Sequence, residues 1–150
     1  IMIYKEMSVV ELLEIPYIND LFDEYAKESK IDAVPEYNPD MEMFKTIEDM
    51  GMLKTVVALN DKKIVGFGTI LFSKLFKYSV MAGTVENIFV LPEYRRGGTG
   101  IKLLRMLEDE AKARGCYTMF MSAPINGSLD KIASYNGYSK TNMTYAKRIM

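Results

Sequence analysis

Three glycines and two arginines fall within six consecutive residues, and together they have the chemistry of an anion-binding site. They are Arg95, Arg96, Gly97, Gly98 and Gly100. Glycine lets a backbone come close to a phosphate, and the first N–H groups of a following helix have no partner within that helix. Arginine adds charge-assisted hydrogen bonds to phosphate oxygens. The run therefore predicts a phosphate-binding turn at the N-terminus of a helix.

The spacing distinguishes this turn from two common nucleotide-binding loops. The P-loop pattern G-x-x-x-x-G-K-[ST] fits in no register around Gly100. The dinucleotide pattern G-x-G-x-x-G fails, because Leu103 stands where its last glycine belongs. The turn reads R-x-x-G-x-G, and the strand before it reads Ile88-x-Val90-x-Pro92-x-Tyr94. This combination resembles the central motif of the GNAT family of acyl-CoA-dependent N-acetyltransferases.

The resemblance implies a fold and a cofactor. The fold is one GNAT-like domain over residues 1–150 in the α/β (α+β) class, with a mixed, twisted sheet and helices on both faces. The cofactor is acetyl-CoA, with its pyrophosphate on the loop amides and its pantetheine arm beside the preceding strand. The residues implied in cofactor binding are Ile88, Phe89, Val90, Arg95, Arg96, Gly97, Gly98, Thr99, Gly100 and Asn126.

One departure from the family pattern lies in the loop itself. The family usually has glycine directly after the arginine and often a basic residue next, whereas here those places hold Arg96 and Gly97. One glycine and one cation are still present in exchanged order, so we expect phosphate binding to be retained.

The reaction implied by the resemblance is direct attack of a primary amine on the thioester, within a ternary complex. A lysine-like amine has a reference pKa of ~10.4, so a base that removes its proton helps at neutral pH. Glu86 is the candidate base. Alternate residues of a strand share a side, so Glu86 is expected to face the same cleft edge as Ile88 and Val90.

The proton donor to the leaving thiolate is less clear from the sequence. Many relatives use a tyrosine four residues before a Gly-Phe pair, but here the pair is Gly137-Tyr138 and Ala133 occupies the tyrosine's place. Tyr135 is the nearest candidate, although it lies about 200° further around a helix. Water or another tyrosine is the alternative acid.

The acceptor pocket of this fold is lined by the segment after the first helices and by the connector before the central strand. Here these segments contribute Glu36, Tyr37, Phe76 and Tyr78. Carboxylates and aromatic rings receive a cationic amine by charge and cation–π contact, although a solvated polar loop has the same composition. Both a small-molecule amine and a protein amine remain open as acceptors.

The composition excludes several classes of site. The chain has no histidine and one cysteine, Cys116, which excludes classical zinc sites and Ser-His-Asp or Cys-His triads and leaves no metal site to predict. A net charge of −1 argues against a nucleic-acid partner. No apolar run approaches the ~18 residues of a membrane span and no signal peptide is evident, so we expect no membrane partner and a cytoplasmic location.

Two further interpretations stay open. Twelve methionines could contribute to a homodimer surface as well as to a core. The absent tyrosine at position 133 also allows a catalytically degenerate GNAT domain that binds acyl-CoA or a protein partner without turnover.

Patterns of apolar residues, caps and turns predict the elements that position these residues. A capping box at Ser8 and Glu11 begins the first helix, and Pro16 kinks or restarts it. Asn38-Pro39 begins the next helix, which ends at Gly51. Helices are also predicted over 98–114 and 128–136. Strands are predicted over 2–7, 53–59, 63–72, 80–91, 117–121 (buried) and 138–149, with a connector over 73–78.

Overall fold

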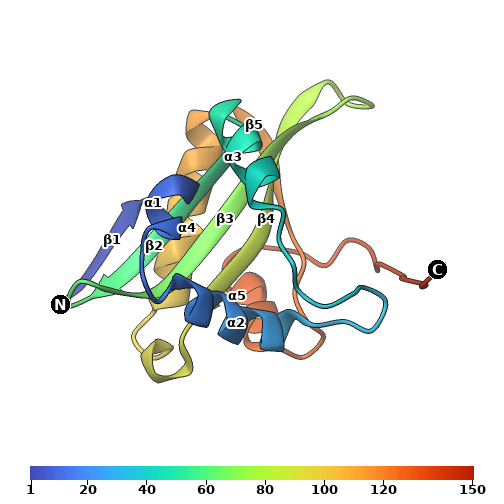
Figure 1. Ribbon diagram of the computed structural model, residues 1–150. Helices are drawn as coiled ribbons and strands as arrows, with labels where there is room; N and C mark the ends of the chain where they lie inside the picture. The colour runs from blue at the N-terminus through green and yellow to red at the C-terminus, as the bar shows by residue number, and fades with distance from the viewer.

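A five-stranded sheet forms the centre of the protein, in a computed structural model that describes residues 1–150. The strands lie in the order β1-β2-β3-β4-β5 (Figure 1). Their bounds are β1 Met2–Glu6, β2 Leu53–Asn60, β3 Lys63–Leu75, β4 Val80–Val90 and β5 Cys116–Met121. Neighbours from β1 to β4 are antiparallel, whereas β5 is parallel to β4. The mixed sheet expected from the sequence is confirmed.

The helices begin largely where the local signals place them. Their bounds are α1 Val9–Leu13, α2 Ile18–Ser29, α3 Met41–Asp49, the 3-10 helix η1 Pro92–Tyr94, α4 Thr99–Ala113 and α5 Ser128–Tyr135. The capping box at Ser8 and Glu11 is present. The cap of α3 is Asp40 and not Asn38, because the Asp40 carboxylate accepts the Met43 N–H at 3.0 Å. None of the helices combines the length and apolarity needed to cross a bilayer.

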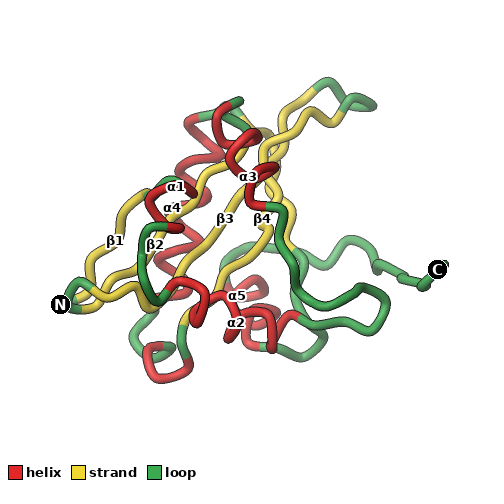
Figure 2. The backbone as a smooth tube through the Cα atoms, in the orientation of Figure 1, coloured by secondary structure: helices red, strands yellow, loops and turns green.

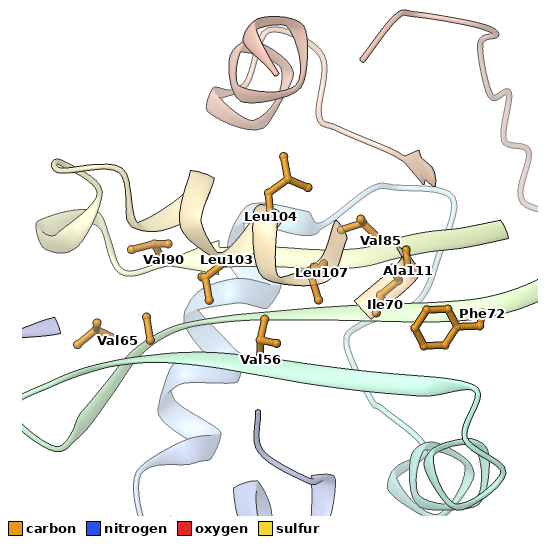
Figure 3. Packing of buried hydrophobic residues seen from close by; sticks show 11 residues of the cluster. Val56, Val65, Ile70, Phe72, Val85, Val90, Leu103, Leu104, Leu107 and Ala111 are labelled. Carbon is orange, nitrogen blue, oxygen red and sulfur yellow. The ribbon is translucent and has the colours of Figure 1, made fainter. Parts of the chain in front are cut away.

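Helices cover both faces of the sheet, as expected. On one face, Leu103 and Leu107 of α4 point down onto the strands and pack with Val56 (Figure 3). On the other face, Leu21 of α2 packs in a second cluster with Val57. Successive residues of a strand point to opposite faces, which is why Val56 and Val57 belong to different clusters.

The predicted connector over 73–78 is part of a β-hairpin. Strand β3 continues to Leu75, β4 begins at Val80, and Leu75 pairs with Val80 across the turn. The hairpin projects from the upper end of the sheet (Figure 1). Strand pairing, which a local pattern does not reveal, extends both strands beyond their predicted ends.

The predictions for the C-terminal part need two corrections. No strand forms over 138–149, which runs as an irregular segment away from the sheet (Figure 2). Strand β5 is not buried: it lies at the sheet edge, none of its residues is fully buried, and Tyr117 is 82% exposed. Without a strand beyond it, β5 leaves one edge of the sheet unpaired.

Candidate active site

A cleft of about 790 Å³ lies beside the C-terminal half of β4. Strand β5 pairs with β4 only as far as Val85, so the backbone of 86–90 has no neighbour on that side. The lining comes from α2 and the turn after it, from these five residues of β4, and from the chain between β5 and α5 together with α5 itself. The cleft therefore contains a strand edge whose N–H and C=O groups are available to an extended ligand.

The glycine loop follows directly after this strand edge. Gly97 and Gly98 have φ values of +95° and +82°, which favour glycine, and a Cβ on either residue would meet nothing within 4 Å. Gly98 is the N-cap of α4, and no side chain caps that helix. The first intrahelical bond of α4 is donated by Lys102 to Gly98, so the N–H groups of residues 99–101 have no partner within the helix. Such a terminus attracts anions, and this geometry fits the predicted pyrophosphate site.

Arg95 has a different setting from the one expected. Its Nε donates to the Val90 carbonyl at 2.8 Å, and its Nη2 donates to both carboxylate oxygens of Glu28 at 2.6 and 2.7 Å. The guanidinium also lies 5.6 Å from the centre of the Phe89 ring. Arg95 therefore ties the loop to β4 and to the end of α2, with only Nη1 left for a ligand. Arg96 is exposed on the loop.

A β-bulge places Glu86 at the cleft. Val85 pairs with Ile70 and Asn87 pairs with Thr69, so Glu86 is the extra residue of β4. A bulge re-aims side chains and interrupts the strict alternation from which the orientation of Glu86 was predicted. Glu86 lines the cleft, as do Ile88 and Val90.

Electrostatics distinguish the two glutamates of the cleft lining. Glu28 is neutralised by its two-fold contact with Arg95, whereas no cation pairs with Glu86. Tyr25 stands near Glu86 from α2. Burial raises the pKa of Tyr25, a hydrogen bond with Ser29 acts against this, and the Glu86 charge raises it further, which keeps the hydroxyl protonated. The cleft thus presents one unpaired carboxylate beside a neutral phenol.

The structure does not bring all the sequence candidates to the cleft. Tyr135 is 87% exposed at the end of α5, outside the lining. Phe76 and Tyr78 lie at the tip of the β3–β4 hairpin, where Tyr78 borders a separate hollow of about 390 Å³. Asn126 adjoins the lining without belonging to it, with a φ of +60°.

The loop before α3 reaches the site indirectly. The Tyr37 ring packs edge-on against Tyr25 at 6.1 Å between centroids, so Tyr37 supports a side chain of the cleft wall. Glu36 is exposed next to it.

Sequence reasoning missed most of the cleft lining, including the polar residues Tyr25, Glu28 and Asn87. Tyr25 falls at helical spacing among the apolar residues of α2, a pattern that is typical of a core-facing side chain. Asn87 carried the one available signal, since it is an amide within the apolar run of β4. Glu28 gave no signal, because its partner Arg95 lies 67 residues away.

Comparisons with known proteins show the family and the fold. The model of the acetyltransferase (GNAT) family matches residues 16–135. No curated protein matches the chain. Among solved structures, the ribosomal-protein-alanine N-acetyltransferase from Brucella melitensis biovar Abortus 2308 is 19% identical with a TM-score of 0.75, over 100% of both chains.

Two other structures are similar to the same extent. The aminoglycoside acetyltransferase meta-AAC0020 from an uncultured soil metagenomic sample, in complex with sisomicin, is 17% identical with a TM-score of 0.77, over 99% of this chain and 96% of that one. A predicted acetyltransferase from Clostridium acetobutylicum, solved with acetyl-CoA, is 19% identical with a TM-score of 0.73, over 99% and 96%. At these identities the likeness shows the fold.

Proposed function

The chain belongs to the acetyltransferase (GNAT) family, and we propose that it transfers the acetyl group of acetyl-CoA to a primary amine. The observation that supports this most is the continuity of three features in one cleft. The start of α4, where Arg95 and Gly100 line the cleft and Gly97 and Gly98 adjoin it, is followed by the free edge of β4 and then by the unpaired Glu86. The pyrophosphate of acetyl-CoA, its extended pantetheine arm and the reacting amine need these three environments in the same order.

The residues present suit acetyl-CoA. We assign its pyrophosphate to the backbone of residues 96–100, where a Cβ at Gly97 or Gly98 would occupy open space. We assign its pantetheine arm to the edge of β4 at 88–90, where no strand pairs on that side and only the Val90 carbonyl is already bonded, to Arg95 Nε. The bound cofactor supplies a thioester, which is open to attack by an amine nitrogen.

Glu86 has the position of a general base in this proposal. At about pH 7, roughly one lysine-like amine in a few thousand is neutral, so an acceptor enters the cleft as its ammonium form. The Glu86 carboxylate, which has no competing cation, accepts a proton from it. The neutral amine attacks the thioester in the ternary complex and forms the C–N bond. As the C–S bond breaks, the nitrogen loses its second proton to solvent, and solvent protonates the leaving thiolate.

Isothermal titration with acetyl-CoA is the first test. Micromolar binding is expected, and pantetheine, which lacks the pyrophosphate, should bind far more weakly because it leaves the glycine loop empty. A panel of amines is then assayed for thiol release: sisomicin, glucosamine 6-phosphate, tyramine and a peptide with N-terminal alanine. Binding without any thiol release would favour the degenerate, ligand-binding domain. Absence of binding would refute both.

Glu86→Gln tests the base. Because a positioned base contributes roughly 10²–10⁴-fold, kcat should fall by about 10²-fold at neutral pH, and by less at high pH, where the amine is already neutral. The control is Glu93→Gln, an exposed glutamate of η1 outside the cleft. An equal loss at every pH would mean that Glu86 is not the base.

A further inference from the structure

The end of the cleft that we assign to phosphate contains a carboxylate. Glu28, near the end of α2, lines the cleft together with Arg95 and Gly100, the two lining residues that flank the glycine turn. The Glu28 side chain is 49% exposed, so its charge acts on the open space of the cleft. Because like charges repel, a carboxylate at this place opposes the binding of a phosphate.

Glu28 anchors Arg95 by hydrogen bonds, but this anchoring does not require a negative charge. Arg95 Nη2 donates to the two Glu28 oxygens at 2.6 and 2.7 Å, while Nε donates to the Val90 carbonyl at 2.8 Å. The guanidinium is thus held from two sides. One of its two partners is already a neutral oxygen, and a neutral side-chain amide at position 28 would offer another.

The charge of Glu28 has a separate effect, on the potential of the glycine loop. The loop has two cations, Arg95 and Arg96. Glu28 compensates the charge of Arg95, whereas no ion pair includes Arg96. Of these three groups, two positive charges less one negative charge leave one net positive charge for a phosphate. Both side chains of the pair are partly exposed, at 49% and 35%, so solvent screens the effect and keeps it moderate.

We propose that Glu28 is a positioning residue, which engages Arg95, compensates its charge and thereby keeps the affinity of the cleft for coenzyme A low enough for the product to leave. This inference rests on the proposed function. Acetyl-CoA and the product CoA carry the same phosphates and the same pantetheine arm, so stronger phosphate binding would hold both more tightly. Such uniform binding does not accelerate the chemical step. It slows product release, which limits turnover in many enzymes.

Glu28→Gln tests the proposal, because glutamine removes the charge and keeps a side-chain oxygen for Arg95. The Kd of CoA, measured by isothermal titration, should fall by roughly 3–10-fold, the effect of removing one charge near a phosphate in a partly exposed site. This gain in affinity should shrink as the salt concentration rises. The Kd of pantetheine, which has no phosphate, should not change. In steady-state assays, the inhibition constant of CoA should fall by the same factor as its Kd.

Glu24→Gln is the matched control. Glu24 lies one turn earlier on α2, is also 49% exposed and also pairs with a cation, Lys27, at 3.1 Å, but it lies outside the cleft. This substitution should leave the Kd of CoA unchanged. Glu28→Asp, which keeps the charge, should bind CoA with nearly the wild-type Kd. Melting temperatures show that each variant is folded.

The direction of the change distinguishes the effect of charge from that of structure. If Glu28 only held the loop in place, Glu28→Gln would bind CoA equally or more weakly, and either result would overturn the proposal. An equal gain in affinity for pantetheine would also overturn it, because the effect would then not act through phosphate. A wild type that does not bind CoA at all would show instead that the proposed function itself fails.

Discussion

Replacing Gly98 by alanine tests the phosphate site with the smallest possible change. Gly98 is the N-cap of α4 and has a φ of +82°. The other end of the same helix offers a matched control in Gly115, with a φ of +72°. A Cβ at either position would meet nothing within 4 Å in the free protein. The two substitutions therefore impose a similar backbone strain, but only one places a methyl group in the anion cradle.

The expected magnitudes follow from this comparison. An L-residue in the left-handed region costs roughly 1–2 kcal/mol, and the reduced entropy of the unfolded chain returns about 0.4–1 kcal/mol. Each variant should lose about 1 kcal/mol of stability, a fall in Tm of roughly 2–4 °C for a chain of this size. Gly98→Ala should also weaken acetyl-CoA binding by at least about tenfold, or ~1.4 kcal/mol, because the methyl group prevents close approach of the pyrophosphate.

Thermal unfolding and isothermal titration on both variants measure the two effects separately. The stability losses should agree, whereas the Kd should change only for Gly98→Ala. Gly98→Glu, which adds a carboxylate to the cradle, should abolish binding. Equal affinities for Gly98→Ala and Gly115→Ala would show that the cofactor does not lie on the glycine loop.

Two further predictions concern Tyr135 and Glu110. Tyr135→Phe should leave kcat and its pH profile unchanged, because Tyr135 is 87% exposed and lies outside the cleft. A loss of turnover would show that Tyr135 takes part in the reaction. A shared hydrogen bond with Glu6, together with burial and the charge of Glu6, raises the pKa of Glu110 to about 7, against weaker opposing effects of Lys54 and Arg114. A raised carboxyl pKa means that stability is lost as pH rises from the unfolded pKa to about 7. Glu110→Gln should therefore gain about 1 kcal/mol over the wild type between about pH 5 and pH 8, a value reduced for solvent screening. The measurement is the melting temperature of both proteins against pH. If the two curves stay parallel across that range, the prediction is wrong.

Local signals predicted the elements that hold the cofactor loop. The capping box at Ser8 and the glycines before α4 act within a few residues, so their effect does not depend on distant partners. The predictions that were wrong concern features that depend on pairing between segments. Strand 138–149 needed β5 as a neighbour, and the connector over 73–78 became a hairpin because β3 and β4 pair to their ends.

The same distinction applies within the site. Glu86 was predicted as the base from its position on the strand before the glycine loop. The bulge that orients its side chain, however, arises from the register between β3 and β4. The sequence also assigned Arg95 to phosphate, whereas its guanidinium is mostly occupied by Glu28 and the Val90 carbonyl. A side chain's type indicates which bonds it can make, and only the assembled fold determines which it makes.

The absence of a cleft tyrosine on α5 is consistent with turnover once the two proton transfers are compared. Making a lysine-like amine neutral at about pH 7 spans ~3.4 pKa units, or ~4.6 kcal/mol. For a leaving thiolate of pKa ~8.5, the difference between its pKa and pH 7 is only ~1.5 pKa units, or ~2 kcal/mol. Water can supply that proton after the thiolate has left. A base is therefore worth more to this reaction than an acid. In the proposed mechanism, Ala133 takes the place of the less valuable group, and the unpaired Glu86 would supply the more valuable one. On this reasoning, Glu86→Gln should cost far more activity than any substitution on α5.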